Sequence, residues 1–301
     1  MNIQSISVCV PAKRCINDCK FCCSKMHAAD YEDRFTKLNT YDDYIKDMRK
    51  RLEYVRQNGC NTCMLTGNNE PQQNKEFLRI FAEINRSLSA PFLNIEMQTS
   101  GAYIDDGMLN FLKNTVGVTT IAISVACISN PEKNIELIQT PDKNLNISKL
   151  AESIKAKNMN LRICLNMNDH MLDGCNSMED PEEAVKDIIS RCKYLNADQI
   201  TCRALWTSED GTSQAEWINQ NVTSLTHDVI KEFKKQVKED GKYLDTLEYG
   251  ADRYDFKGFS TVIDEDSMAQ SQEKKDSVKY LILRPNGKLY SKWDSKASLI
   301  F

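Results

Sequence analysis

Apolar and polar positions follow two different periods along the first two-thirds of the chain, and these periods predict the fold. Short runs rich in Ile, Val, Leu, Cys and Thr predict strands at residues 3–10, 60–66, 92–98, 119–125, 161–167 and 199–205. Between these runs, apolar residues recur at helical spacing, as in Met48, Leu52 and Val55. Strands that alternate with helices favour parallel β/α units with right-handed crossovers, so we expect an α/β fold.

The last third of the chain breaks this alternation. Residues 279–290 hold two apolar runs around an Asn-Gly pair, which is a strong hairpin signal. Residues 264–276 are polar and charged without an apolar period, which predicts a loop. We therefore expect a β/α domain over residues 1–205 and a C-terminal α+β extension over residues 206–301.

Three cysteines near the N-terminus, Cys15, Cys19 and Cys22, carry the candidate chemistry. Three closely spaced thiolates suit one face of a cubane cluster, and soft sulfur ligands suit iron–sulfur or zinc. A four-iron cluster with three protein ligands keeps one iron open for a substrate or cofactor. A zinc site would need a fourth ligand, and Cys23 and His27 leave that alternative open.

Composition narrows the class of protein further. The chain has 301 residues, 41% of them hydrophobic, and a formal net charge of −4. This balance gives no clear sign of nucleic-acid binding, and no apolar stretch is long enough to span a bilayer. The N-terminal residues lack the basic region and apolar core of a signal peptide. We therefore expect a cytoplasmic protein whose twelve cysteines are reduced.

The run Cys-x3-Cys-x2-Cys, with Phe21 before the third cysteine, resembles the signature of the radical S-adenosylmethionine (radical SAM) superfamily. In that family the amino and carboxylate groups of S-adenosylmethionine chelate the open iron. Reductive cleavage of this cofactor gives a 5′-deoxyadenosyl radical that abstracts a hydrogen atom. The resemblance implies one 4Fe-4S cluster held by Cys15, Cys19 and Cys22. It also implies a reducing partner such as flavodoxin or ferredoxin, and a partial (β/α)6 TIM-like barrel, whose number of units this chain matches. We expect the C-terminal extension to close the open side of this barrel and to shape the substrate site.

A second motif directly follows the second predicted strand and reads Thr-Gly-Asn-Asn-Glu-Pro. It resembles the family segment ending Gly-Glu-Pro that binds the amino group of S-adenosylmethionine. Gly67, Glu70 and Pro71 match this segment, whereas Asn69 stands where the family commonly has glycine. Asn tolerates left-handed backbone better than most residues. The resemblance therefore implies cofactor contacts from Gly67, Asn68, Asn69 and Glu70.

Polar residues at the ends of the later strands extend the implied cofactor site. By position they resemble the family's contacts to the methionine carboxylate, ribose and adenine, and they are Gln98, Ser124, Asn166 and Arg203. Phe21 is expected to shield the cluster and touch adenine. From the residues alone, Ser124 is equally a small core residue and Arg203 an ion-pair partner. Cys127 is the candidate catalytic thiol that returns a hydrogen atom, with inert packing as the alternative.

These features together predict a radical SAM enzyme acting on a small molecule, a nucleotide or a short peptide. The alternatives are a zinc-binding or electron-transfer iron–sulfur protein, or a glycyl-radical activating enzyme acting on a partner protein. The extra ferredoxin-like cysteines of such activating enzymes are missing, since no cysteine follows Cys202. Residues of the last third that are expected either to line the substrate pocket or to anchor the hairpin are Tyr249, Arg253, Tyr254, Lys292, Trp293 and Asp294.

Overall fold

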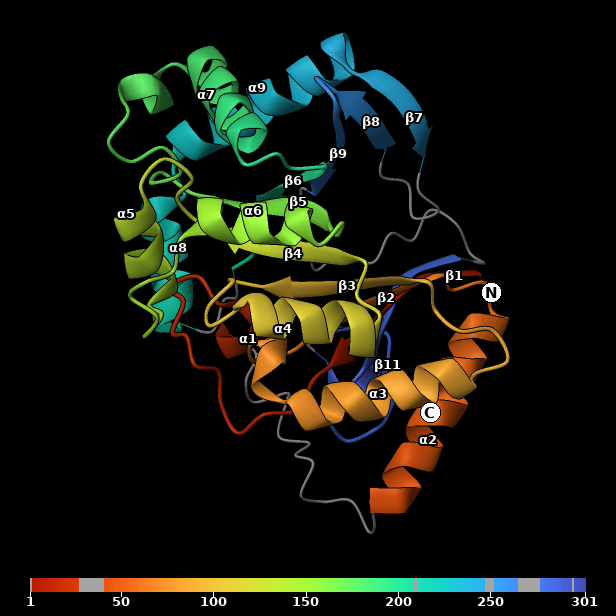
Figure 1. Cartoon of the computed structure of the whole chain (residues 1–301). Coiled ribbons are helices and arrows are strands. Elements are labelled where there is room, and N and C mark those ends of the chain that lie inside the picture. The colour runs from red at the N-terminus through yellow and green to blue at the C-terminus, as the bar shows by residue number, and fades with distance from the viewer. Residues whose placement is uncertain (1, 27–40, 208–210, 247–251, 265–276, 294) are drawn as a thin grey trace.

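One mostly parallel sheet organises the chain. The computed structural model describes residues 2–26, 41–207, 211–246, 252–264, 277–293 and 295–301. The described strands are β1 (Asn2–Cys9), β2 (Thr62–Thr66), β3 (Asn94–Thr99), β4 (Thr120–Val125), β5 (Asn160–Met167), β6 (Gln199–Ala204), β7 (Lys242–Thr246), β8 (Asp252–Phe256), β9 (Phe259–Asp264), β10 (Ser277–Leu283) and β11 (Leu289–Tyr290). In this part of the chain they form one sheet, in the order β11-β10-β1-β2-β3-β4-β5-β6-β9-β8-β7 (Figure 1).

Helices lie between the strands along the chain, and most of them cover the outer face of the sheet. They are α1 (Cys23–Met26), α2 (Tyr41–Gln57), α3 (Lys75–Ser87), α4 (Asp106–Phe111), α5 (Pro131–Ile138), α6 (Ile147–Ala156), α7 (Pro181–Tyr194), α8 (Ser213–Asn221) and α9 (Ser224–Asp240). In Figure 1, α3, α4 and α6 lie over the strands. Residues 2–26, 41–207 and the later described segments contain no helix that is long and apolar enough to cross a membrane.

Helix starts in this fold are set by Asn and Asp side chains that precede them. Asn74, Asn130, Asn146 and Asp180 each accept hydrogen bonds from backbone N–H groups in the first turn of α3, α5, α6 and α7. Such caps satisfy donors that the helix itself leaves unpaired. The apolar stripe predicted for α2 is buried in the main core, which fixes that helix against the sheet.

The six parallel strands β1 to β6 confirm the predicted β/α alternation, and the sheet they form is a partial barrel. The hairpin predicted around Asn286-Gly287 is confirmed as β10 and β11, in which Ile282 pairs with Tyr290. The sequence did not predict that β9 pairs parallel to β6, or that β10 pairs parallel to β1. The C-terminal segment therefore lengthens the partial barrel at both edges, and β9 and β10 do not pair with each other among the described strands.

Successive residues on each inner strand face opposite sides of the sheet, and the two sides differ in chemistry. On β3, Ile95 and Met97 lie in the main core, whereas Glu96 and Gln98 line an internal cavity. On β5, Leu161, Ile163 and Leu165 are core residues, whereas Arg162 and Asn166 line the same cavity. The interior of a closed β/α barrel is normally packed with branched apolar side chains. This open barrel instead has a polar interior, and that interior holds the candidate site.

Candidate active site

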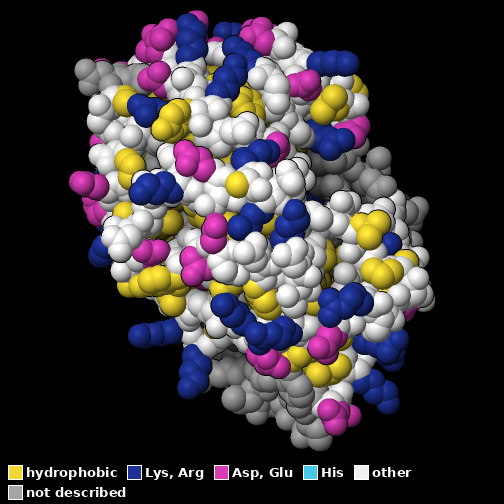
Figure 2. Space-filling view, in the orientation of Figure 1, with side chains coloured by type: hydrophobic (Ala, Val, Ile, Leu, Met, Phe, Trp, Pro, Cys, Tyr) yellow, Lys and Arg dark blue, Asp and Glu magenta, His cyan; other side chains and the backbone are white. Residues whose placement is uncertain are grey.

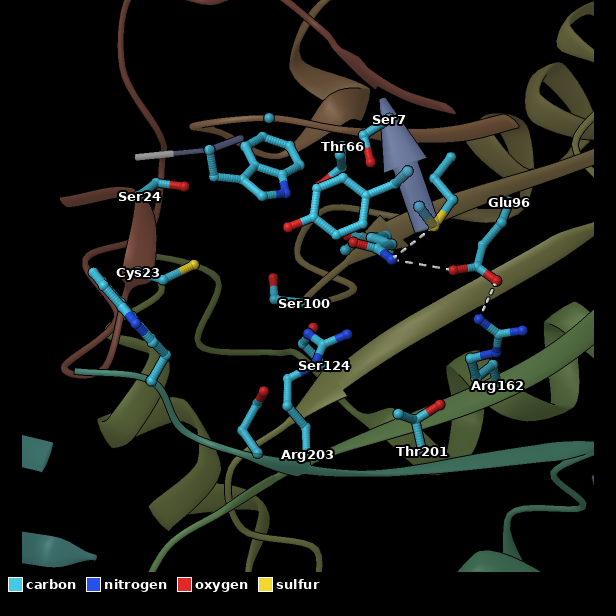
Figure 3. A pocket seen from close by; sticks show the side chains of 18 of the residues that line it. Ser7, Cys23, Ser24, Thr66, Glu96, Ser100, Ser124, Arg162, Thr201 and Arg203 are labelled. Carbon is cyan, nitrogen blue, oxygen red and sulfur yellow. Dashed lines mark hydrogen bonds and ion pairs between the residues drawn. The ribbon is translucent and has the colours of Figure 1, made fainter. Parts of the chain in front are cut away.

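A cavity of about 530 Å³ lies on the inner face of the sheet. Its lining brings together almost all the residues that the sequence nominated. These are Cys15, Cys19, Phe21, Cys22, Gly67, Asn68, Asn69, Glu70, Gln98, Ser124, Asn166 and Arg203. In Figure 3, Ser100, Ser124 and Arg203 surround the same space as Cys23 of α1. The carboxyl ends of parallel strands meet at one edge of a sheet, which explains how residues far apart in sequence meet here.

The cysteine loop follows β1 and is fixed by contacts along its length. Cys22 N–H donates to Cys19 O at 3.3 Å, and Asn17 N–H donates to Cys15 Sγ at 3.4 Å. Lys20 N–H donates to the carbonyl of Leu137 in α5 at 3.0 Å. The loop is therefore ordered by the protein chain itself.

The three thiols lie close enough for their charges to repel one another. Burial, followed by the neighbouring Cys22 and then Glu70, raises the pKa of Cys19 well above its usual value. Burial, with Cys23 and Cys15 nearby, raises the pKa of Cys22 to about 12. The pKa of Cys15 is also raised, mainly by burial. A positively charged iron core favours thiolates at such positions, so the donor set suits an iron–sulfur cluster.

A single metal ion is a different case. Within the described residues, which do not include His27, no group of three or more His, Cys, Asp and Glu side chains is gathered closely enough to hold one ion. The ligands of one zinc ion converge on a point, whereas the three cysteines of a 4Fe-4S cluster bind separate irons.

The segment after β2 runs beside the cysteine loop and offers unused acceptors. Gly67 has a φ of +149°, and a Cβ there would lie 3.1 Å from the carbonyl oxygen of Val10, so the close approach requires glycine. Asn69 Nδ2 donates to that same carbonyl at 2.6 Å. Asn68 Oδ1 and Asn69 Oδ1 are buried and accept no hydrogen bond from any described residue. Buried acceptors without donors are costly, so they suit a ligand that donates, such as an ammonium group.

Glu70 differs from the neighbouring asparagines because its side-chain oxygens already accept hydrogen bonds from the protein. Its carboxylate is buried and accepts hydrogen bonds from Asn17 Nδ2 at 2.9 Å and Gln72 Nε2 at 3.0 Å. Ser100 N–H donates to both carboxylate oxygens at 3.1 Å, and Thr99 Oγ1 donates to Oε2. All these neighbours are donors, which suits an acceptor-only carboxylate. Contact between this side chain and the cofactor stays a prediction, because the protein already supplies the partners of both oxygens.

A family model described as the Radical SAM superfamily matches residues 9–168, which is more than half of the chain. The chain belongs to the radical SAM superfamily. A search of curated protein sequences found no match.

Solved structures show the same fold at low sequence identity. Native anSMEcpe with bound AdoMet aligns with a TM-score of 0.61 and 15% identity over 99% of this chain and 77% of that chain. Native anSMEcpe with bound AdoMet and Cp18Cys peptide gives 0.58 and 15%, over 98% and 75%. Coproporphyrinogen III oxidase (HemN) from Escherichia coli, a radical SAM enzyme, gives 0.52 and 14%, over 81% and 54%. This radical SAM chain thus covers about half to three-quarters of the length of those proteins.

The candidate catalytic thiol of Cys127 does not reach the radical SAM cavity. The backbone N–H groups of Ala126 and Cys127 donate to Asn134 Oδ1 at 2.9 and 3.2 Å, which turns the chain toward α5. Cys127 is buried in an apolar cluster, with Sγ 3.6 Å from Ser129 Oγ, and is not among the lining residues. Cys23 lines the cavity instead. A catalytic role for Cys127 therefore has no support from its position.

Sequence reasoning missed part of this radical SAM site. The missed lining residues include Glu96, Arg162, Gln199, Thr201 and Tyr280. Each lies within a strand rather than after one. For Glu96, Arg162 and Thr201 the available signal was a polar residue between two apolar ones. Of the candidates in the last third, Arg253 and Trp293 line the cavity and Tyr254 and Lys292 do not, whereas Tyr249 and Asp294 lie outside the described residues.

Arg284 positions the aromatic wall of the cavity. It is fully buried, and its Nη2 donates to the carbonyls of Lys292 at 3.1 Å and Trp293 at 2.9 Å. Its guanidinium lies 4.1 Å from the ring centroid of Tyr290. Lys cannot reproduce the planar fork, so Arg284→Lys should destabilise the fold by roughly 2 kcal/mol. Urea unfolding of both proteins would measure this, and an unchanged midpoint would contradict the role given to Arg284.

Proposed function

We propose that this radical SAM enzyme cleaves S-adenosylmethionine at one 4Fe-4S cluster held by Cys15, Cys19 and Cys22, and acts on a polar substrate in the barrel cavity. The cluster, once bound, supplies the electron that releases the 5′-deoxyadenosyl radical. The observation that carries the proposal is a single cavity lined both by the three cysteines and by polar residues of the inner strands.

The chain's own side chains would hold S-adenosylmethionine at the carboxyl ends of the strands. Asn68 Oδ1 and Asn69 Oδ1 are acceptors suited to its ammonium group. Ser124, Asn166 and Arg203 come from β4, β5 and β6 and offer donors for its carboxylate and ribose. Phe21 and Ile138 line the cavity beside them and would exclude water from the reacting atoms.

The substrate we propose is a small molecule, a nucleotide or a residue of a short peptide. The volume of about 530 Å³ must hold both S-adenosylmethionine and the reacting part of the substrate, which favours a small polar group. Peptides bound to anSMEcpe make a peptide substrate one of the three options. The extension after residue 205 would shape this site, because Arg253, Tyr280 and Trp293 line the cavity.

Electrons would come from a reducing partner such as flavodoxin or ferredoxin. All twelve cysteines are free thiols, which accords with a reducing cytoplasm. On the face seen in Figure 2, basic and acidic side chains are interspersed. That face therefore offers no extended basic patch of the kind that binds nucleic acid.

Anaerobic reconstitution tests the proposal directly. The protein would be loaded with iron and sulfide and then given S-adenosylmethionine and dithionite. We expect 5′-deoxyadenosine, detected by mass spectrometry, in amounts that follow cluster content. Stoichiometric zinc without any iron–sulfur cluster in the purified protein would overturn the proposed function.

A further inference from the structure

The floor of the cavity holds an ion pair that the proposed cofactor site does not use. Glu96, Arg162 and Gln199 lie toward the amino ends of β3, β5 and β6, whereas the cysteine loop follows the carboxyl end of β1. Arg162 Nη1 contacts Glu96 Oε2 at 2.6 Å, and Figure 3 shows the two side chains facing each other. We call these two residues the floor pair.

A short side chain between the two strands allows the floor pair to form. Ala122 of β4 stands opposite both Gln98 of β3 and Arg162 of β5 in the strand register. Arg162 can therefore pass over β4 to reach Glu96. Gln199 Oε1 accepts a hydrogen bond from Arg162 Nε at 2.8 Å, and Gln98 Nε2 donates to Glu96 Oε1 at 3.2 Å. Both charged groups are thus held in place by amides.

The two charges of the floor pair differ in their access to the cavity. The Glu96 side chain is 5% exposed, whereas the Arg162 side chain is 30% exposed. Arg162 lies on the inner face of the sheet, so its exposed edge opens into the cavity. Its contacts use Nε and Nη1, and no described residue takes a hydrogen bond from Nη2. The floor therefore presents a fixed guanidinium edge with its counter-charge covered behind it.

Holding a charged pair inside a protein is costly and is often no more stabilising than apolar packing. A floor with a fixed, open guanidinium edge is instead suited to binding. We propose that Arg162 determines substrate specificity by binding an oxyanion group of the substrate, either a carboxylate or a phosphate. This inference rests on the proposed function, because it assigns the substrate's position in the same cavity. A guanidinium that is already held loses little freedom when it binds an anion, and its planar fork matches both groups.

A second guanidinium on the neighbouring wall points to the same chemistry. Arg253 of β8 donates from Nε and Nη2 to Asp245 at 3.0 and 2.6 Å, and it lines the cavity. In the strand register, Val262 of β9 lies between Arg253 of β8 and Thr201 of β6. Thr201 also lines the cavity. Cationic residues outnumber acidic ones along the cavity lining. The acidic residues are Glu70 and Glu96, and the cationic ones are Arg162, Arg203, Arg253 and Lys279. This excess favours an anionic substrate.

Small anions test the inference without knowledge of the substrate. The reconstituted protein with saturating S-adenosylmethionine would be titrated with inorganic phosphate and with malonate at constant ionic strength. The rise in melting temperature then gives each dissociation constant. We expect saturable stabilisation by at least one of them. A stronger response to phosphate indicates a phosphorylated substrate, a stronger response to malonate indicates a carboxylate, and equal responses support the oxyanion class alone.

The matched variant replaces the whole floor pair, because Arg162→Gln alone would leave Glu96 buried without its partner. Glu96→Gln with Arg162→Gln should raise the dissociation constant of the bound anion by about tenfold or more, as expected for losing a charge-assisted hydrogen bond. The control is Glu76→Gln with Arg79→Gln, which removes a surface pair with the same charges. Equal weakening in both double variants, or no anion response in the wild-type protein, would overturn the inference. A wild-type protein that forms 5′-deoxyadenosine but binds neither anion refutes only the anion site.

Discussion

A protein in which Cys15, Cys19 and Cys22 are all replaced by Ala should hold no cluster and form no 5′-deoxyadenosine. The three thiols line the cavity, and Cys23 is the one further cysteine among the described residues that line it. A reconstituted wild-type protein should carry about four irons and four sulfides per chain, as one cubane cluster requires. Iron and sulfide analysis, visible absorption and mass spectrometry of the product would be measured together on both proteins.

Cys23 is the matched control for this experiment. It directly follows Cys22, lines the same cavity and belongs to α1, so Cys23→Ala removes a neighbouring thiol without removing a predicted ligand. We expect this variant to keep its iron and its cleavage of S-adenosylmethionine. Loss of metal in Cys23→Ala, with one zinc per wild-type chain, would contradict the cluster and favour a zinc site with Cys23 as fourth ligand.

The barrel core was predictable because its local signals agree with its packing. The runs that became β1 to β6 bury one face against helices, and the apolar stripe on α2 lies in that core. The parallel placement of β9 and β10 was not predictable from the same signals. Their pairing with β6 and β1 joins residues distant in sequence, and a strand's apolar pattern does not state which neighbour it pairs with.

The cofactor end of the site could be predicted because its residues form short motifs in consecutive positions. The floor pair could not, because Glu96 and Arg162 are separate polar residues in two strands that β4 separates. Their contact crosses β4, where the small Ala122 stands opposite Arg162. Cys127 illustrates the limit of position in sequence. Its place after β4 suggested the cavity, but the backbone N–H groups of Ala126 and Cys127 donate to Asn134 Oδ1 of α5, and Cys127 is not among the residues that line the cavity. Its catalytic role stays a prediction.

Removing Asn17 should loosen the cysteine loop almost as much as removing Glu70, although Asn17 is not one of the three cysteines that define the loop's motif. Asn17 Nδ2 donates to Glu70 Oε1 and to Ser100 Oγ, both at 2.9 Å, and Asn17 is 4% exposed. This contact ties the loop to the end of β3. A hydrogen bond to a buried carboxylate contributes roughly 1.5–3 kcal/mol, so Asn17→Ala should raise amide exchange in residues 15–22 by about tenfold or more. Hydrogen exchange of the metal-free protein measures this before any cofactor is bound.

Two further variants separate the effect of the Asn17 hydrogen bonds from a general loss of stability. Asn85→Ala removes another buried asparagine, whose side chain bonds the backbone of Phe92 far from the loop, so exchange in residues 15–22 should rise no more than elsewhere. Glu70→Gln should keep most of the protection. Asn17 Oδ1 accepts no hydrogen bond from any described residue, so the Asn17 amide can turn over and accept from the new Gln amide. The Ser100 hydroxyl, which accepts from Asn17 Nδ2 in the wild-type protein, can then donate to the same oxygen.

Glu70→Ala tests whether the Glu70 carboxylate acts by holding the cysteine loop through Asn17 or by binding the cofactor directly. If the carboxylate acts through the loop, Glu70→Ala and Asn17→Ala should weaken S-adenosylmethionine binding together, and the double variant should bind no more weakly than Glu70→Ala alone. If the carboxylate instead contacts the ammonium group, Asn17→Ala should leave the affinity unchanged and only Glu70→Ala should lower it. The hydrogen bonds from Asn17, Gln72, Thr99 and Ser100 already satisfy both oxygens, so we expect the first result. The acceptors left for the ammonium group are then those of Asn68 and Asn69, the two residues directly before the glutamate.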